Sequence, residues 1–117
     1  MINSKRKGNA GENEIVHILT DAGFPAIRSN QRKPGGGMGN PDVRVMGLPI
    51  HIEVKRTERL NLNAAMLQAE RDSKGLIPCV VHRGNRQPWR VTLNLADFLN
   101  LCKVDAKEPR GEVKPCE

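Results

Sequence analysis

The sequence predicts an α/β fold with a mixed central sheet of about five strands flanked by helices. Three observations support this prediction. The run Ile50–Lys55 alternates strictly between apolar and polar residues, as a half-buried strand does. Apolar residues recur at helical spacing in residues 8–22 and again in residues 61–73. Helical and extended segments alternate along the chain, an order typical of a sheet covered by helices.

The composition limits what this chain can be. Its 117 residues suit one domain with a modest core. The net charge of +6 favours an anionic partner, most simply nucleic acid. No apolar run approaches the ~20 residues of a membrane span, and the polar, basic N-terminus does not look like a signal peptide. The odd number of cysteines and the scattered histidines indicate a reducing, intracellular setting without a zinc site.

The first helix is expected over residues 8–22, with Gly23 as its stop. The basic residues 1–7 before it suit either a frayed terminus or an arm that contacts phosphates. On a helical wheel Glu12 falls within the apolar arc, whereas Glu14 falls outside it. A carboxylate on a packing face is costly unless it is paired or ligates a metal, which favours a metal-site role for Glu12. The alternative is an interaction with the helix dipole, which explains an acid in the first turn but not its direction.

A short strand at residues 24–28 leads into a glycine-rich loop at residues 29–40. Pro25 limits that strand to a sheet edge or a strand start. The loop carries Arg32 and Lys33, so it is either a basic segment that grips an anionic partner or a plain linker. It is not a phosphate-binding P-loop, because no Gly-Lys-Ser/Thr follows.

Residues 41–55 are the stretch around which the chain is organised. Asp42 opens one strand, a short turn follows, and Glu53 and Lys55 lie on one face of the next strand. A hairpin of this kind can carry Asp42 close to Glu53. Two carboxylates suit a hard cation such as Mg²⁺, and a lysine beside it can stabilise charge on a phosphate or orient the attacking water. The alternative is a solvated strand face of alternating charge. His51 shares this face and is a candidate for DNA contact.

The second half of the chain completes the sheet. A helix capped by Asn61 or Asn63 is expected to run to Ser73, with Gln68 on its surface. The elements that follow are a buried strand (77–82), a basic turn (83–86), a last strand (89–93) and a short helix that Asn94 caps and Cys102 ends. Residues 103–117 lack an apolar pattern and are expected to be a disordered tail behind a domain of residues 1–102.

Four pieces of the chain, in their order and spacing, resemble the PD-(D/E)XK nuclease superfamily, and most of all the archaeal-type Holliday-junction resolvases and their phage relatives. They are Lys7–Glu12, Gly23–Arg28, Pro41–Asp42 and Ile52–Lys55. The resemblance implies a restriction-endonuclease-like nuclease core and a homodimer that cuts four-way DNA junctions with Mg²⁺, or with Mn²⁺ in its place. It also implies the cytoplasm of a prokaryotic cell or of a phage-infected host.

The resemblance gives individual residues their roles. Glu12, Asp42 and Glu53 become the metal-site acids, and Lys55 becomes the catalytic lysine. Arg28 becomes a basic residue near the bound phosphate, and the basic segments supply the other expected DNA contacts. Together the expected DNA-binding residues are Lys7, Arg28, Arg32, Lys33, Arg83 and Arg86.

The sequence therefore predicts a metal-dependent endonuclease that cleaves branched DNA. A duplex or flap nuclease with the same core is the alternative within this class, and a DNA-binding module with an inactive site is the alternative outside it. Three acids facing an anion bring a protein that only binds DNA little benefit, which weighs against the inactive module. Phe98, Leu99, Leu101 and Trp89 could supply an apolar dimer patch, with core packing as the alternative use.

Overall fold

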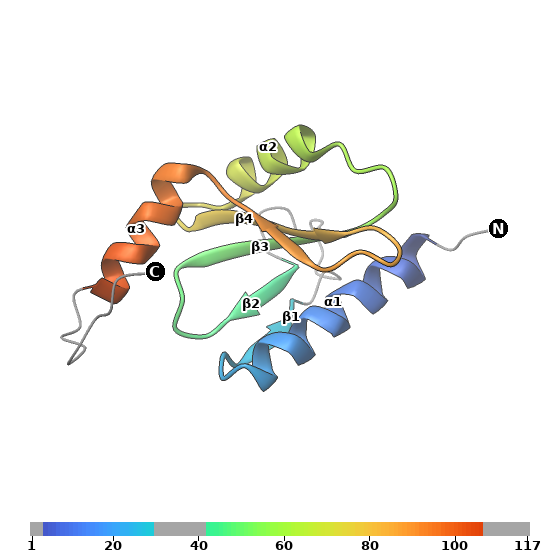
Figure 1. Ribbon diagram of the computed structural model, residues 1–117, viewed down its shortest axis with the longest axis horizontal. Coiled ribbons are helices and arrows are strands. Elements are labelled where there is room, and N and C mark those ends of the chain that lie inside the picture. Colours follow the sequence, from blue (N-terminus) through green and yellow to red (C-terminus); the bar gives the residue numbers. More distant parts are fainter. Residues whose placement is uncertain (1–3, 30–41, 107–117) are drawn as a thin grey trace, which may run out of the picture.

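The computed structural model describes residues 4–29 and 42–106 and shows one five-stranded sheet with helices against both faces (Figure 1). The sheet order is β1-β2-β3-β4-β5, with β3 and β4 parallel and the other neighbours antiparallel. The elements are α1 (Ser4–Asp21), β1 (Ala26–Arg28), β2 (Val43–Val45), β3 (Ile50–Arg56), α2 (Leu62–Asp72), β4 (Ile77–Arg83), β5 (Arg90–Thr92) and α3 (Leu95–Ala106). The predicted α/β class and mixed sheet are confirmed, and the strand after Pro25 is an edge strand.

Helix α1 begins at Ser4, earlier than the sequence pattern indicated. The alternative of a frayed terminus is therefore wrong for residues 4–7. Lysine and arginine are good helix formers, and they extend the helix through this segment. The other end follows the prediction, with Gly23 at φ 97°. There the Phe24 N–H donates to the Leu19 carbonyl at 2.8 Å, and the Gly23 N–H donates to the Thr20 carbonyl at 3.0 Å. These two bonds form a Schellman motif, which satisfies carbonyls left open at the helix end.

One face of the sheet packs against α1. The buried cluster on this face consists of Ile15, Ala26, Val43, Val45, Ile52, Val54, Cys79 and Val81. Gly11 lets the helix approach closely, because a Cβ there would lie 3.3 Å from the Arg56 Cβ and 3.5 Å from the Val54 Cγ1. Burial, and then the charge of Asp97, raise the pKa of the Cys79 thiol to about 11. Cys79 is thus a protonated core residue.

Helix α2 covers the opposite face. Asn61, and not Asn63, is its N-cap, since the Asn61 Oδ1 accepts from the Ala64 N–H at 3.0 Å. Its buried residues Ala65, Met66 and Ala69 cluster with Val80 of β4. Val80 and Val81 point to opposite sides of the strand, so α2 and α1 lie on opposite faces of the sheet. The result is a three-layer arrangement with β3 and β4 at its centre.

Helix α3 continues to Ala106, beyond residue 102 where a helix end and a tail were expected. Lys103 lies in its last turn, where a positive charge is favourable beside the helix dipole. The helix stands at one end of the sheet and makes few contacts with the rest of the described chain (Figure 1). Before it, the Asn94 Nδ2 donates to the Glu70 Oε2 at 2.8 Å. The rest of the expected tail, residues 107–117, lies outside the described residues.

Across residues 4–29 and 42–106, no helix is both long enough and apolar enough to cross a membrane.

Candidate active site

The hairpin of β2 and β3 places Asp42 opposite Glu53. Val43 pairs in register with Ile52, so the residues that precede and follow them face each other across the strands. The Asp42 N–H donates to the Ile52 carbonyl at 2.8 Å, and the Val54 N–H donates to the Asp42 Oδ2 at 2.8 Å. These two bonds fix both the main chain and the carboxylate of Asp42 against β3. The juxtaposition that the sequence indicated is therefore present.

The carboxyl group of Asp42 holds its proton more tightly than an exposed aspartate does. Burial is the largest cause and the negative charge of Glu53 the next, and they raise the pKa of Asp42 from 3.8 to about 7. The bond from the Val54 N–H opposes this shift, and the charge of Glu12 adds to it. Two carboxyl groups crowded in this way retain a proton near neutral pH unless a cation takes its place. Because all the donors are oxygens, the pair suits Mg²⁺ or Mn²⁺.

The face of β3 that carries Glu53 is buried, so the alternative of a solvated strand face is wrong. Glu53 is 3% exposed and His51 is 1% exposed, because α2 packs over this side of β3 and β4. His51 consequently cannot contact DNA in this arrangement, which corrects the expectation from the sequence. Its Nε2 lies instead 3.3 Å from the Glu53 Oε1. Strict alternation gave the correct face for both residues, but it could not show that a helix covers that face.

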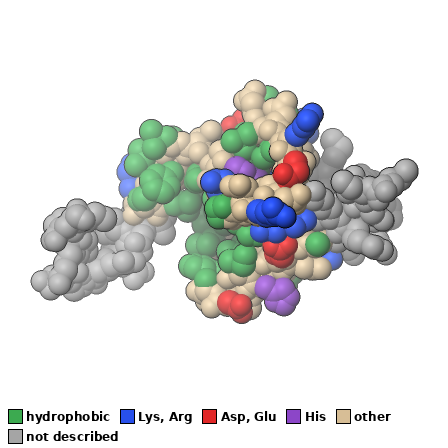
Figure 2. All heavy atoms as spheres, turned by 45° about the vertical axis from the view of Figure 1, so that its right-hand side comes forward, with side chains coloured by type: hydrophobic (Ala, Val, Ile, Leu, Met, Phe, Trp, Pro, Cys, Tyr) green, Lys and Arg blue, Asp and Glu red, His purple; other side chains and the backbone are tan. Residues whose placement is uncertain are grey.

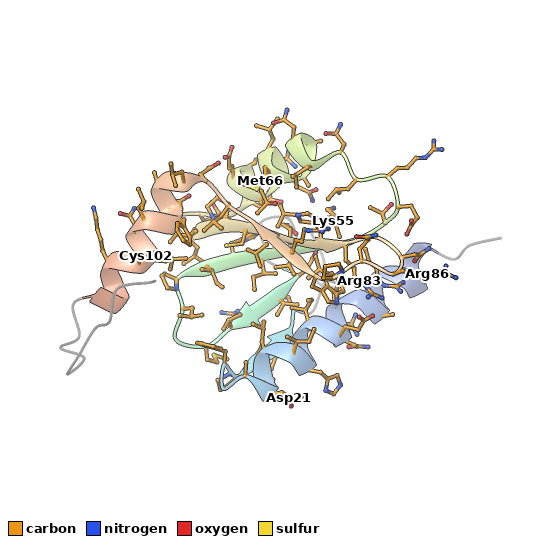
Figure 3. The ribbon with its side chains drawn as sticks, viewed as in Figure 1. Asp21, Lys55, Met66, Arg83, Arg86 and Cys102 are labelled. Atoms are coloured by element: carbon orange, nitrogen blue, oxygen red, sulfur yellow. The ribbon has the colours of Figure 1, made fainter. Side chains whose placement is uncertain are left out.

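Lys55 lies on the same face as Glu53, near α2 (Figure 3). Its Nζ donates to the Gln68 Oε1 of α2 at 3.3 Å. Gln68 was expected to be a plain surface residue, and this is wrong because the side chain is half-buried and holds the lysine. Its place three residues after the buried Ala65 is the signal that could have identified it, since residues three apart share a helix face.

Glu12 comes to the site from α1. Its side chain is 14% exposed against 39% for Glu14, which agrees with the helical wheel. The Arg28 Nε donates to the Glu12 Oε1 at 3.1 Å, so a guanidinium offsets this carboxylate. Within the described ranges, no three His, Cys, Asp or Glu side chains gather closely enough to hold a metal ion by themselves. The geometry therefore fits a cation held by Asp42 and Glu53, with water and a substrate phosphate completing its coordination.

A second cluster lies at the same ends of β3 and β4 but on the α1 face. Arg56 and Arg83 are in register there, and alternation turns them away from the face of Lys55. The Glu14 Oε2 lies 3.7 Å from the Arg56 Nε, and the Glu14 Oε1 lies 3.9 Å from the Arg83 Nη2. The Trp89 Nε1 also donates to the Glu14 Oε1 at 3.1 Å, and the Arg83 guanidinium lies 5.5 Å from the Trp89 ring centroid. These four residues are called the arginine cluster below.

The arginine cluster has an excess of positive charge, because one carboxylate offsets two guanidinium groups. The Nε atoms of Arg56 and Arg83 are buried and have no hydrogen-bond partner within the described part of the chain. Arg56 and Glu14 were not among the sites expected from the sequence. The signal for Arg56 was its place one residue after Lys55, which sends it to the opposite face of β3.

The other expected DNA contacts differ in how the structure places them. Arg86 is exposed in the turn after β4, at φ 62°, and lies with Arg83 at one end of the molecule (Figure 3). Lys7 lies within α1, and Arg32 and Lys33 lie outside the described residues. Basic side chains gather near the centre of one face, with acidic side chains close by (Figure 2). Basic side chains on this face are of the kind that contact a phosphate backbone, and acidic side chains lie among them.

A mixed five-stranded sheet between helices, with an Asp and a Glu-x-Lys segment on one hairpin, defines the PD-(D/E)XK class of nuclease folds. The family model described as archaeal Holliday junction resolvase (Hjc) matches residues 3–91 of this chain. The chain therefore belongs to the archaeal Holliday junction resolvase family, and the resemblance suggested by the sequence motifs is confirmed.

A solved structure supports the same assignment. The chain is similar to Hjc of Archaeoglobus fulgidus, a Holliday junction resolvase from an archaeal hyperthermophile, with 25% sequence identity and a TM-score of 0.59. The likeness covers 74% of this chain and 76% of that chain. Among curated proteins, none matches this chain.

The raised pKa of Asp42 predicts that metal binding depends on pH. Between its ordinary value of 3.8 and about 7, the folded protein holds a proton on Asp42 that the unfolded chain has lost. Without metal, the free energy of unfolding should therefore fall as pH rises through this window. A cation must displace that proton, so its apparent affinity should rise by about tenfold per pH unit and level off above pH 7.

Calorimetric titration with Mn²⁺ across this pH range checks the prediction. Asp42→Asn should bind weakly at every pH and lose the dependence. A parent protein whose affinity is the same at about pH 5.5, well below the pKa of Asp42, and at about pH 7.5, above it, would contradict it.

Proposed function

We propose that this chain is a metal-dependent endonuclease that cleaves branched DNA, with the four-way junction as its preferred substrate. Membership of the archaeal Holliday junction resolvase family supports both the reaction and the substrate. The observation that carries the proposal is the crowding of Asp42 against Glu53 on the hairpin that also bears Lys55. That arrangement combines donors for a hard cation with an ammonium group for a phosphate.

Asp42 and Glu53 would hold the ion, which we expect to be Mg²⁺, with Mn²⁺ able to replace it. When bound, the ion supplies Lewis-acid chemistry, lowering the pKa of the attacking water and neutralising charge on the scissile phosphate. The side chains of the protein position the reactants. Lys55, held by Gln68, donates to a phosphate oxygen or to the water and stabilises the charge of the transition state. Glu12 adds negative charge and orients Arg28 toward the same edge.

DNA would be held through its phosphates. The arginine cluster and Arg86 lie at the end of the sheet where β3 and β4 finish. Each phosphate that a cationic side chain neutralises releases about 0.9 counterions from duplex DNA, so affinity should fall steeply with salt. Contacts of this kind carry no base information, which suits an enzyme that recognises the shape of a junction.

Two other functions remain as alternatives to be tested. A duplex or flap nuclease would use the same carboxylates and lysine, so only the substrate separates it from a resolvase. A DNA-binding module with an inactive site would gain nothing from two buried carboxyl groups whose crowding raises the pKa of Asp42. Such crowding is costly, and a bound cation is what offsets the cost.

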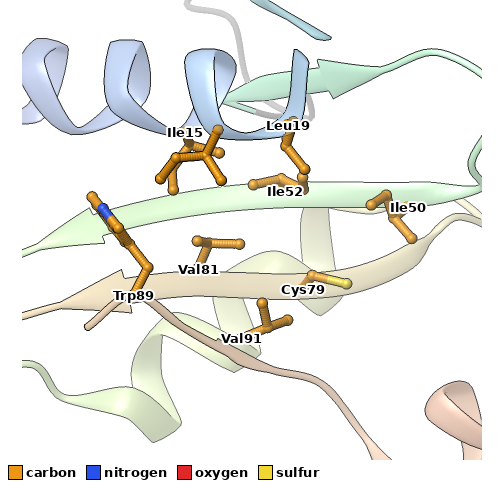
Figure 4. A pocket seen from close by; sticks show the side chains of 9 residues that line it. Ile15, Leu19, Ile50, Ile52, Cys79, Val81, Trp89 and Val91 are labelled. Carbon is orange, nitrogen blue, oxygen red and sulfur yellow. The ribbon is translucent and has the colours of Figure 1, made fainter. Parts of the chain in front are cut away.

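We also propose that the chain works as a homodimer. Cutting two opposing strands of a junction calls for two active sites, most simply related by a twofold axis. An apolar cavity of about 280 Å³ opens on the α1 side of the sheet, where side chains of α1, β3, β4 and β5 surround it (Figure 4). Trp89, one of the residues expected in a dimer patch, lines this cavity and packs against the core.

Exposed apolar side chains lie beside this cavity on α1 and β5, and others lie on α3. They are Ile18, Val91, Leu95, Phe98 and Leu99, which we call the apolar patch. Phe98 and Leu99 were expected there, whereas Leu101 is half-buried. A helix that contacts its own domain little and exposes apolar side chains is typical of an interface. The patch is therefore the surface that we assign to the second copy.

The substrate proposal predicts a specific order of cleavage. With Mg²⁺, the parent protein should cut a four-way junction faster than a flap, a duplex or a single strand, and EDTA should abolish all cutting. Asp42→Asn and Lys55→Ala should each lower cleavage by about 10²-fold or more, while junction affinity holds or rises for Asp42→Asn because a negative charge is lost. Gel assays of the four substrates check this. Equal cutting by Asp42→Asn and the parent would disprove the metal-site assignment.

The two acids of α1 should behave differently when their charge is removed. Glu12→Gln should lower cleavage because Glu12 is the acid of α1 that faces the proposed site, and its negative charge is lost. Glu14→Gln should leave turnover on a saturating junction intact and lower the free energy of unfolding by no more than about 1 kcal/mol, since Glu14 is partly exposed. Single-turnover rates and urea melts give the comparison. A larger loss of cleavage at Glu14 would reverse the assignment.

Disrupting the apolar patch should separate the copies. Val91→Asp and Phe98→Asp place a charge in the proposed interface and should shift the protein from dimer to monomer in light scattering, with circular dichroism unchanged. Asn100→Asp, also exposed on α3, is the matched control and should stay dimeric. A parent protein that is monomeric even with a junction bound would remove the resolvase proposal and leave the simpler nuclease.

A further inference from the structure

We propose that His51 is a positioning residue that holds the Glu53 carboxylate in the orientation needed for metal binding. The proposal rests on the function proposed above, because it gives His51 a role toward that metal site. His51 would touch neither the DNA nor the reacting atoms, since it is almost completely buried. It would affect metal binding only by orienting Glu53.

The contact between the two side chains is short and enclosed. The His51 Nε2 lies 3.3 Å from the Glu53 Oε1, and both side chains are buried. A carboxylate oxygen can only accept, so the proposed role requires the tautomer in which Nε2 carries the hydrogen and donates it. The donor replaces part of the hydration that Glu53 loses on burial. With Oε1 engaged in this way, the carboxylate cannot rotate freely, and its second oxygen remains for the cation beside Asp42.

Core packing alone does not explain a histidine at this position. In register, His51 lies beside Pro78 of β4, and the residues that α2 buries on this face are apolar. An apolar side chain would be buried there at lower cost than an imidazole with polar ring atoms. Burial of the imidazole is offset only if a partner accepts a hydrogen bond from its N–H, and Glu53 is the partner that the structure provides.

A second histidine on the same sheet face gives an internal comparison. His82 of β4 lies in register with Lys55, and its Nε2 lies 2.8 Å from the Thr92 Oγ1 of β5. This bond links two strands and involves no carboxylate. A histidine on this face is therefore not connected to the metal site by its position alone, which makes His82 a matched control.

Three substitutions at His51 separate positioning from simple packing. In His51→Gln the amide nitrogen lies about as far along the side chain as Nε2, so the donor is kept. In His51→Asn the amide nitrogen corresponds to Nδ1 and falls short of Glu53, and His51→Leu has no donor at all. Calorimetric titration with Mn²⁺ in the absence of DNA is the main measurement. Metal-free junction binding, thermal melting and cleavage are measured on the same proteins, with Asp42→Asn as the reference for a lost ligand.

We expect His51→Leu and His51→Asn to lower Mn²⁺ affinity by about 10–100-fold, as loss of a residue that orients a metal ligand does. His51→Gln should stay close to the parent, and so should His82→Leu. Metal-free junction affinity should be unchanged in all of them, and raised Mn²⁺ should restore cleavage by His51→Asn.

Each contrary result has a distinct meaning. Parental Mn²⁺ affinity in His51→Leu or His51→Asn overturns the positioning role, and so does a loss in His51→Gln as large as that in His51→Asn. The comparison of Gln with Asn still decides the matter if His51→Leu fails to fold, because both replacements are polar and of similar size. A parent protein that binds no Mn²⁺ rejects the proposed function itself, whatever the variants do.

Discussion

The crowding of Asp42 and Glu53 on one hairpin is the constraint on which the rest of the site depends. Burial and mutual repulsion raise the pKa of Asp42 to about 7, so the pair is unfavourable while both groups are charged. The surrounding donors offset part of this cost: the Val54 N–H bonds Asp42, and His51 bonds Glu53. The remaining negative charge favours a bound positive charge, and a divalent cation stabilises the two carboxylates more than a single proton does.

Alternate residues of strand β3 point to opposite faces of the sheet, so this strand contributes side chains to both faces. Glu53 and Lys55 face α2, where the proposed chemistry lies, whereas Val54 and Arg56 face α1. The carboxylates and the arginine cluster are therefore close in sequence but separated by the sheet. This separation keeps two guanidinium groups from neutralising the carboxylates that should hold a cation. The cluster has its own acid, Glu14, which lies near both arginines and apart from the proposed metal site.

The sequence predicted most of the fold and the central pair, and it did so for physical reasons. A turn between two strands leaves little freedom in register, so Asp42 had to fall near Glu53. Alternation likewise fixed which residues share a face. It could not show that α2 would bury that face, and for this reason His51 was misplaced at the DNA and Gln68 on the surface. Tertiary packing decides such questions, and a local pattern contains no information about it.

The placement of the apolar patch adds a last consequence for how such an enzyme would work. Arg83 and Arg86 lie at one end of the molecule, and α3, which carries Cys102, lies at the other (Figure 3). An interface formed there would leave the reactive edge of each copy free for its own DNA strand. Dimer formation and cleavage would then depend on different side chains, so a substitution could abolish one and leave the other intact. A domain of this size has too little surface to hold several duplex arms alone, and pairing at the far end enlarges the DNA surface without blocking Lys55.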